Sequence, residues 1–445
     1  MSTEYRRSGV ALVLVLWAIA VLSLLTGGLS FAIRQDLAVC SLQRDRLIAH
    51  VLARAGVERA IAAIKDDSPG TDTLDDFWCD DTSSMREVEL VGGTFSVMHG
   101  SHDRMPIVRY GAADESGKLN VNAATRKQLL ALREMTEPMA GAIIDWRDGN
   151  EEPQPDGIER SYYTSLDHPY TIRNGPLRTV RELLLVRDVT PELLYGEDAN
   201  ANGLLDPNEH DGDASPPGDN ADGRLDRGWF AYLTVYSYER NTDSIGQKRL
   251  NIKTADAASI RQRLSLEDWA AQSIVKARGE KDFEHLVDLL DVELDPSVPR
   301  DPEKDDINPR AEDEKDQPVT VGIFQRIVGN ITLTDDQMLP GRININTASQ
   351  EVLATLPGVD DELVDRIIRY RDGGGFASIG GLLDVSGMTK EKFAKLESHV
   401  TVRSNVFRVL SHGLAESGLA KATIECVVDR SGDVPRILYW RESSP

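Results

Sequence analysis

Six oxygen donors recur at regular spacing in the stretch DANANGLLDPNE, residues 198–209. The stretch fits D-x-[DN]-x-[DN]-G-x5-E at every defined position, the spacing of a calcium-binding loop. The donors would be the side chains of Asp198, Asn200, Asn202, Asp206 and Glu209 and the backbone carbonyl of Leu204. Hard oxygen ligands suit Ca²⁺: Glu209 would bind through both oxygens, and Gly203 permits the sharp turn. The sequence therefore predicts a structural calcium site here, with a solvated acidic turn as the alternative.

A second acidic run, DGDASPPGDNADGRLD, follows directly. With Gly223 aligned to the loop glycine, the donors would be Asn220, Asp222, the carbonyl of Arg224, and Asp226. The first and last ligand positions fall on Gly218 and Trp229, so two ligands must come from elsewhere, such as Asp211, Asp213 or Asp219. A second Ca²⁺ site is therefore expected to be incomplete. Neither loop has a good pair of flanking helices, which favours fixed calcium over a sensor that opens.

Other candidate chemistry is sparse. His99 and His102, with Asp103, could suggest a metal pair, but they stand between expected strands and a hairpin turn is the better interpretation. The three cysteines, Cys40, Cys79 and Cys426, lack the spacing of a thiolate zinc site, and their pairing is left open. The sequence contains no catalytic serine, zinc-protease, phosphate-loop or dinucleotide motif, so no catalytic residue is assigned and no enzyme is expected.

Three similar helical units position these loops. KLNVNAATRKQLLAL begins at Lys118, RLNIKTADAASIRQRL at Arg249 and RININTASQEVLATL at Arg342. Each copy continues into a second helical segment, with equivalent arginines at 147, 278 and 371. The equivalent asparagines at 120, 251 and 344 are expected to bond to the backbone and order the turn into the helix. Thr347 with Gln350 has the form of a capping box.

The units resemble helix-hairpin-helix, or SAM-like, domains, most clearly from Ile343 to Val385. DNA-binding hairpins present backbone N–H groups to a phosphate. Here Asp360 and Asp361 follow the Pro-Gly-Val turn and would repel it. The chain also has 50 basic against 73 acidic residues, a net charge of −23. We therefore expect no nucleic-acid binding.

The N-terminus predicts a membrane anchor. After Arg6 and Arg7, the stretch from Gly9 to Ile33 carries no charge and is long enough to cross a bilayer as a helix. The arginines favour a cytoplasmic N-terminus. Helical periodicity continues to Lys65, which predicts one helix of roughly 85 Å. A cleaved signal peptide, or an anchor followed by a separate helix, is the alternative.

This leader, helix and set of inserted units resemble the K-type minor pseudopilin of type II secretion systems. The most specific stretch is IIDWRDGNEEPQPDGIERSYYTSLDHPYTIRNGPLRTVRELLLV, which looks like the family's first α-module. The resemblance implies cleavage after Gly9 by a prepilin peptidase, methylation of Val10, and calcium in the acidic loop. It also implies I- and J-type minor pseudopilin partners, contact with the inner-membrane secretion machinery, and a single-pass inner-membrane protein with its bulk in the periplasm.

The expected fold class is α+β: a transmembrane helix continuing as a long stalk, and a pilin-like antiparallel sheet body with inserted helix-hairpin-helix modules. The expected segments are a leader (1–9), the transmembrane helix and amphipathic stalk (10–66), pilin-like strands (67–117), the first α-module (118–190), the acidic loops (191–228), a strand (229–248), the second α-module (249–293), an acidic linker (294–318), a strand (319–341), the third module (342–400) and C-terminal strands (401–445).

Leu14 is the fifth residue of the expected mature chain, where most pseudopilins have a glutamate that neutralises a neighbouring α-amino group. Without that carboxylate the subunit has no such neighbour, as expected at the leading end of a filament. The predicted function is therefore a cap on the pseudopilus tip, with a structural role in protein export across the outer membrane. A membrane-anchored helix-hairpin-helix DNA receptor is the alternative.

Overall fold

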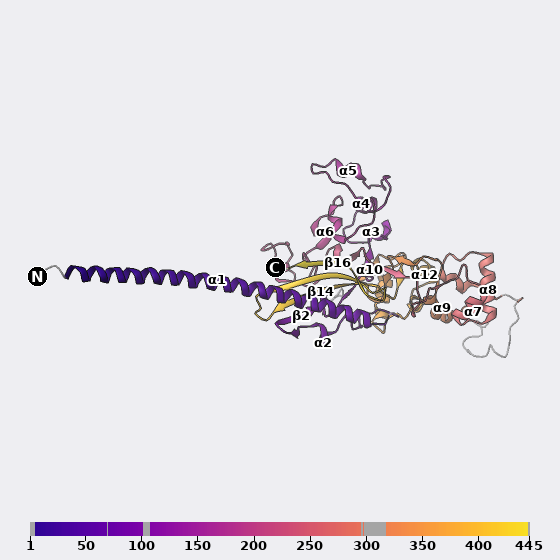
Figure 1. Cartoon of the computed structure of the whole chain (residues 1–445). Helices are drawn as coiled ribbons and strands as arrows, with labels where there is room; N and C mark the ends of the chain where they lie inside the picture. Colours follow the sequence, from indigo (N-terminus) through magenta and orange to yellow (C-terminus); the bar gives the residue numbers. More distant parts are fainter. Residues whose placement is uncertain (1–4, 69, 101–106, 295–296, 298–316, 444–445) are drawn as a thin grey trace.

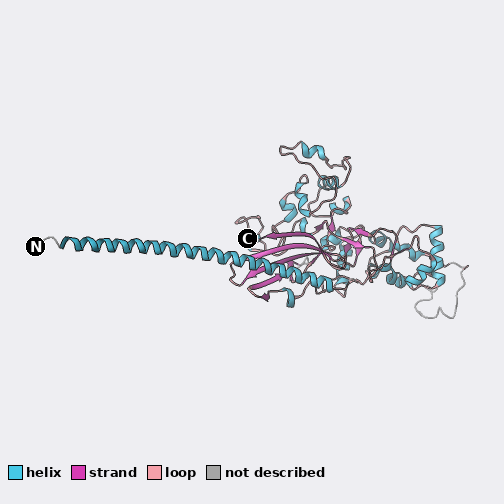
Figure 2. Ribbon diagram, in the orientation of Figure 1, coloured by secondary structure: helices cyan, strands magenta, loops and turns pink. Residues whose placement is uncertain are grey.

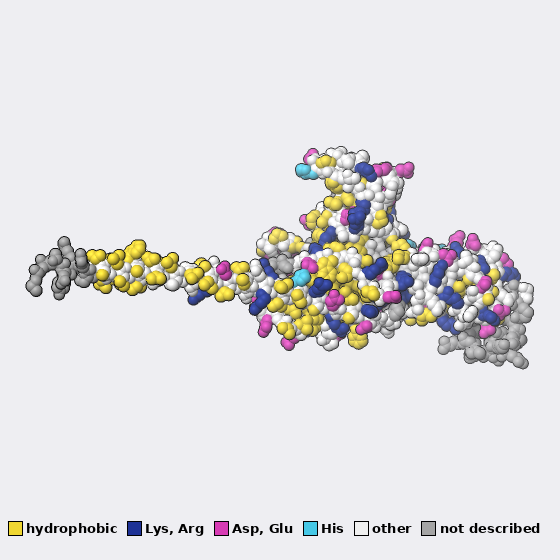
Figure 3. All heavy atoms as spheres, in the orientation of Figure 1, with side chains coloured by type: hydrophobic (Ala, Val, Ile, Leu, Met, Phe, Trp, Pro, Cys, Tyr) yellow, Lys and Arg dark blue, Asp and Glu magenta, His cyan; other side chains and the backbone are white. Residues whose placement is uncertain are grey.

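The structure is a computed structural model that describes residues 5–68, 70–100, 107–294, 297 and 317–443. One helix, α1 (Tyr5–Asp66), runs from the N-terminus into a head formed by the rest of the chain (Figure 1). The helix is unbroken, as expected, and does not divide into an anchor and a separate helix. From Val10 onwards it is long and apolar enough to span a membrane, and it fits a single-pass anchor. Apolar side chains cover its N-terminal half (Figure 3).

The C-terminal half of α1 is part of the head's core. Leu52, Val57 and Ile64 lie on one face and are at most 2% exposed. Gly56 lets this face approach the sheet closely, because a Cβ there would lie 2.2 Å from the Ser411 hydroxyl. The apolar face of the predicted amphipathic stalk therefore packs against the sheet.

The sheet is antiparallel and lies against α1 (Figure 2). Its order is β1 (Val88–Leu90), β2 (Gly93–Val97), β14 (Val406–Ala415), β15 (Lys421–Asp429) and β16 (Arg436–Ser443), with β5 (Ala113–Asp114) also paired to β14. A short helix, α2 (Thr82–Met85), precedes β1, and the hairpin of β3 (His99–Gly100) and β4 (Val108–Arg109) follows β2.

The helical modules are insertions into this sheet. The chain leaves the sheet after β5 and returns at β14, and the three repeats lie between these paired strands. This arrangement confirms the predicted α+β fold with inserted modules.

Each module is closed by a two-stranded parallel pair. The pairs are β6 (Leu119–Asn120) with β7 (Leu233–Thr234), β9 (Leu250–Asn251) with β10 (Ile331–Thr332), and β12 (Ile343–Asn344) with β13 (Val400–Thr401). The first module therefore ends at β7, and the acidic loops lie inside it, not after it. A further antiparallel pair, β8 (Tyr238–Arg240) with β11 (Met338–Pro340), lies between modules.

The helices follow the repeat. The first module contains α3 (Arg126–Leu130), α4 (Glu137–Arg147), α5 (Arg160–Thr164), α6 (Pro191–Tyr195) and the 3-10 helices η1 (Val180–Leu185), η2 (Pro207–Glu209) and η3 (Trp229–Ala231). The second contains α7 (Ala257–Leu264), α8 (Asp268–Glu280), η4 (Leu286–Asp291), α9 (Val321–Ile327) and η6 (Val328–Asn330). The third contains α10 (Gln350–Ala354), α11 (Asp361–Arg371), η7 (Ile379–Asp384) and α12 (Lys390–Leu396).

The three equivalent arginines and asparagines have the same role in each copy. Arg147 donates to the carbonyls of residues 121 and 124, Arg278 to those of 252 and 255, and Arg371 to that of 348. The side-chain oxygens of Asn120, Asn251 and Asn344 each accept from the amide two residues later. The backbone role predicted for the asparagines is confirmed, and the arginines lock each strand-to-helix turn.

Two local predictions are wrong. Residues 319–341 do not begin as a strand: the Thr320 side chain caps the Ile323 amide, and Phe324 and Ile327 are buried on one face of α9. The cap of α10 is Ser349, which accepts from the Val352 amide. The Thr347 hydroxyl instead donates to Asp114. Most of the expected linker at 294–318 lies outside the described residues.

Candidate metal centre

The first acidic loop folds around its predicted ligands. Both oxygens of Asp198 accept backbone amides, from Asn202 and Gly203, each at 2.9 Å. Asn200 and Asn202 direct their side-chain amides at the same Asp206 oxygen, at 2.7 and 2.8 Å. Gly203 adopts φ +73°, which allows the turn. The structure thus brings four of the six predicted donors, Asp198, Asn200, Asn202 and Asp206, into one bonded group.

Glu209, the sixth donor, is buried without a cationic partner. It is 1% exposed; one oxygen accepts the Asp206 amide at 3.1 Å, and Oε1 has no hydrogen bond. Burial, followed by Asp198 and Asp206, raises its pKa to about 7. A buried carboxylate with an unsatisfied oxygen is costly, and a cation would satisfy it. These residues therefore fit the expected calcium ion, with Asp198 and Glu209 supplying charge and the asparagines neutral oxygens.

The loop also attaches the first module to the sheet. Arg408, on β14, donates to the Ala201 carbonyl at 3.0 Å, and Arg227 donates to that of Gly203 at 2.8 Å. The Gly100 amide, on β3, donates to the Asn202 carbonyl. Gly100 must be glycine for this contact, because a Cβ would lie 1.8 Å from the Gly203 carbonyl oxygen. An ordered loop therefore fixes the module to the sheet.

The second acidic loop repeats the geometry of the first. Ala221 and Gly223 have φ +54° and +79°, close to the +59° and +73° of Ala201 and Gly203. The Asn220 side-chain amide points at Asp226, at 3.4 Å, as that of Asn200 does at Asp206. The Asp222 side chain accepts the Arg224 amide. The two loops are structural copies.

Two residues that the sequence did not single out stand where the second loop lacked ligands. Glu197 accepts the Asp226 amide at 2.8 Å, which is the role of Glu209 in the first loop. His210 Nδ1 accepts the Gly223 amide at 3.2 Å, as Asp198 does for Gly203. Glu197 directly precedes the first loop and His210 directly follows it. That adjacency is the signal that could have identified them.

The acids suggested in their place have other partners. Asp219 accepts the amides of Asp211, Gly212 and Ala221. Asp211 accepts the amide and hydroxyl of Ser215. Both carboxylates stabilise the turn before the second loop.

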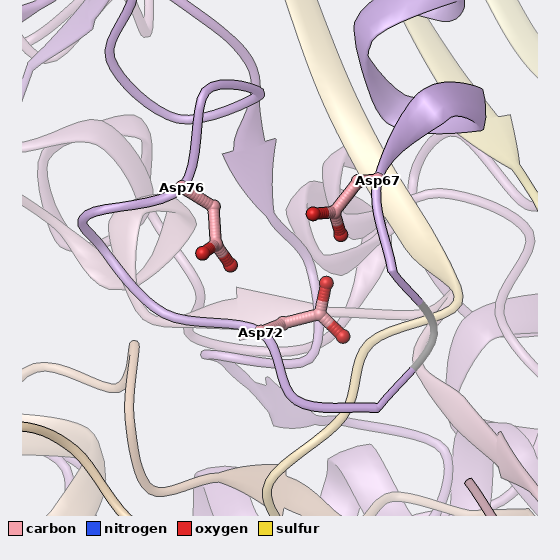
Figure 4. A group of neighbouring side chains, drawn as sticks. All are labelled: Asp67, Asp72 and Asp76. Carbon is pink, nitrogen blue, oxygen red and sulfur yellow. The ribbon is translucent and has the colours of Figure 1, made fainter.

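A third acidic group needs no external cation. Asp67, Asp72 and Asp76 converge just beyond the end of α1 (Figure 4), with oxygens within 4.8 Å of one another. Arg430 lies against Asp67 at 2.8 Å and Asp72 at 2.5 Å. Asp76 accepts the Thr73 amide and the Trp78 indole N–H. The protein itself supplies the positive charge here.

The histidine and cysteine candidates form no metal-ligand group among the described residues. His99 lies on β3 of the expected hairpin, and burial lowers its pKa to about 4. His102 and Asp103 lie outside the described residues. The three cysteines are free, and burial raises the pKa values of Cys79 and Cys426 to about 12. Neither buried thiol is a nucleophile at neutral pH.

The hairpin of the third module is occupied by its own carboxylate. Asp360 accepts the Leu363 amide at 2.9 Å, at the start of α11, and pairs with Lys392 at 3.2 Å. The amide first, and then Lys392, lower its pKa. Asp360 therefore fills the position that a phosphate would take.

Comparison with known proteins identifies two segments. Residues 110–195 match the family described as type II secretion system (T2SS), protein K, and residues 341–401 match the helix-hairpin-helix motif.

Individual relatives share smaller parts. ComE operon protein 1 of Bacillus subtilis (strain 168) is 30% identical over 174 residues, 38% of this chain and 78% of that protein, so the two belong to one family over that stretch. The endonuclease/exonuclease/phosphatase family domain-containing protein 1 of Danio rerio is 42% identical over 64 residues, 14% of this chain. This chain spans only 12% of the length of that relative.

Among solved structures, the crystal structure of the GspK-GspI-GspJ complex from the type 2 secretion system of enterotoxigenic Escherichia coli contains a similar chain. The alignment covers 92% of this chain and 100% of that one, with a TM-score of 0.46 and 13% identity.

Proposed function

Because the chain belongs to the K-type minor pseudopilins of the type II secretion system, we propose that it caps the tip of the pseudopilus. In this role it is a structural subunit in protein export across the outer membrane, without enzymatic activity. Its partners would be the I- and J-type minor pseudopilins, the prepilin peptidase and the inner-membrane machinery. It would be held in the inner membrane by α1, with the head in the periplasm.

The placement of the modules carries this proposal. The second module (α7, α8 and α9) and α12 of the third module lie beyond the C-terminal end of α1, on the side away from the N-terminus (Figure 1). In a filament whose subunits align their N-terminal helices, that is the space for the next subunit. A head filled in this way leaves no room above it, which favours the end of the filament. Leu14, an uncharged residue in the apolar half of α1, agrees with this position.

The position in the filament can be tested directly. Labelled full-length chain in purified pseudopili should mark one end of each filament in electron micrographs. Labelling along the shaft would contradict the tip role.

Processing is tested separately. The intact mass of membrane-extracted protein should correspond to a chain that begins at Val10 after removal of residues 1–9, with one added methyl group. Cleavage between Leu25 and Ile33 would indicate an ordinary signal peptide and end the pseudopilin proposal.

Calcium is part of the proposal as a structural ion. The first site would use Asp198, Asn200, Asn202, Leu204, Asp206 and Glu209. The second would use Asn220, Asp222, Arg224, Asp226, Glu197 and His210. The unsatisfied Oε1 of Glu209 supports the first site, and the repeated loop geometry supports the second. Bound ions would hold the first module against the sheet.

A further inference from the structure

In the part of the chain that the structure describes, a different acidic group in the first module makes no ion pair. It lies where α4 ends and α5 begins, on the part of the module that projects from the head (Figure 1). Asp145 is in the last turn of α4 and is 0% exposed, and Glu159 directly precedes α5 and is 7% exposed. The fold has therefore withdrawn two carboxylates from water, which requires compensation.

Hydrogen bonding does not supply that compensation. Neither oxygen of Glu159 has a hydrogen-bond partner, and its side chain makes no capping bond to α5. Asp145 Oδ1 accepts the Gln154 amide at 2.9 Å, but Oδ2 is unpartnered. A Cβ on Gly157 would lie 2.0 Å from Oδ2, so only glycine leaves this oxygen its place.

Neighbouring carboxylates further disfavour the ionised form of Glu159. Burial, then Asp145, Asp148 and Glu151, raise the pKa of Glu159 to about 7. Burial is also the main cause of the raised pKa of Asp145. Three neighbouring carboxylates thus act on Glu159 across the segment that joins α4 to α5.

Local arginines are committed elsewhere. Arg126 pairs with Glu137 at 2.7 Å and donates to the Pro155 carbonyl at 2.8 Å. Arg160 pairs with Glu151 at 3.0 Å. Arg126 acts electrostatically on Asp145, but neither guanidinium is bonded to Asp145 or Glu159, so the two buried carboxylates have no directly bonded cation among the described residues.

We propose that Asp145 and Glu159, with Asp148, bind a divalent cation of the calcium class at the junction of α4 and α5. Carboxylate oxygens are the ligands that Ca²⁺ prefers, and water would complete its coordination. Among the described residues these three carboxylates do not converge within 4.8 Å as the Asp67 group does, so binding must draw them together. This site is separate from the acidic loops at 197–226 and does not depend on the secretion role.

Calcium titration of the full-length chain in detergent tests the proposal. Glu209→Ala with Asp226→Ala weakens the two loop sites, so calorimetry on this double variant isolates the junction. It should still bind about one equivalent of Ca²⁺, and adding Glu159→Gln should remove that equivalent. Glu152→Gln, which changes an exposed carboxylate in the same segment, is the matched control and should leave binding unchanged.

A second measurement separates binding from folding. Metal-free Glu159→Gln should melt no lower than the metal-free parent, because it removes an uncompensated buried charge, while losing part of the calcium-induced rise in melting temperature. Retention of the full equivalent by the Glu159→Gln protein would overturn the proposal. So would the absence of calcium binding in the double variant, which would mean that Asp145 and Glu159 share a proton instead.

Discussion

Two buried glutamates, Glu239 and Glu209, differ in how their negative charge is compensated. Glu239, on β8, is 2% exposed and Glu209 is 1% exposed. Arg249, Arg342 and Arg403 pair with Glu239 at 2.5, 2.9 and 2.8 Å. Burial would raise the pKa of Glu239, but the three arginines outweigh it and hold the pKa well below its usual range. Among the described residues no arginine is bonded to Glu209, and burial raises its pKa to about 7.

The difference follows from what each region joins. The arginines around Glu239 come from the entry of the second module and from both ends of the third, so their convergence fixes the modules together. Glu425, on β15, does the same for the first module, because Arg181 of η1 pairs with it at 3.3 Å beside Arg408 and Arg441. At both of these contacts between modules or with the sheet, arginines of the protein neutralise the buried glutamate. Glu209 in the first acidic loop has no such arginine partner among the described residues, and we propose that a bound ion supplies the positive charge there.

The largest expected effect comes from breaking the internally neutralised group. Glu239→Ala leaves three arginines near one another without their carboxylate, and removing one member of a buried ionic group costs about 3–5 kcal/mol. Chemical denaturation of the detergent-solubilised chain at pH 7 measures the loss. Glu351→Ala, at an exposed carboxylate on α10, is the control and should stay within about 0.5 kcal/mol of the parent. A loss as small as the control's would contradict the role assigned to Glu239.

The pH dependence of the same variant sharpens the comparison. Because the folded-state pKa of Glu239 is below its usual value, its contribution is present above about pH 4.5 and is lost as the pH falls through the lowered pKa. The free-energy difference between parent and Glu239→Ala should therefore be constant from pH 7 to 5 and shrink in stronger acid. Denaturation series at these pH values provide the measurement. A difference that shrinks between pH 7 and 5 would show that the arginines do not lower this pKa.

Calcium removal tests the other member of the comparison. Bound Ca²⁺ should stabilise the protein by about 2.7 kcal/mol at a hundred times its dissociation constant. Chelation should lower the melting temperature, and Mg²⁺ should restore it poorly because it resists dehydration and prefers octahedral geometry. Glu209→Ala should abolish most of the effect, and Asp226→Ala should remove less. If chelation leaves the melting curve unchanged and elemental analysis finds no calcium, the loop is only an acidic turn.

Short-range sequence patterns predicted much of the fold. Contacts between residues far apart in the sequence could not be predicted in this way. The predicted ligands of the first loop lie within twelve residues, so spacing alone was enough to propose them. Each asparagine of the repeats accepts from the amide two residues along the chain, so the sequence predicted that contact correctly. Glu197 and His210 were not predicted because they lie outside the motif of the second acidic loop, to which they bond. The arginines of Glu239 are separated from it by 10, 103 and 164 residues, and only the folded modules bring them together. A strand was expected near residue 321, but this segment forms α9, which buries Phe324 and Ile327 on one face.

For the last prediction no effect is expected: the third module should not bind nucleic acid. Two arginines of α11, Arg366 and Arg371, are engaged within the protein. Arg371 donates to the Ala348 carbonyl, and Arg366 pairs with Glu362 and donates to the Ser386 carbonyl.

The amides at the start of α11 give the same result. Asp360 already accepts there, so a phosphate would have to displace a fixed negative charge and approach a chain of net charge −23. Backbone binding to DNA depends on released counterions and hence on free basic groups. The full-length chain in detergent should therefore show no salt-dependent shift with duplex or single-stranded DNA in fluorescence anisotropy at physiological ionic strength. Asp360→Asn, which keeps the cap but removes the charge, should not create binding, because the arginines remain engaged. Micromolar binding by the parent that weakens steeply with salt would instead favour a DNA receptor. It would show that a phosphate can displace Asp360 from the Leu363 amide.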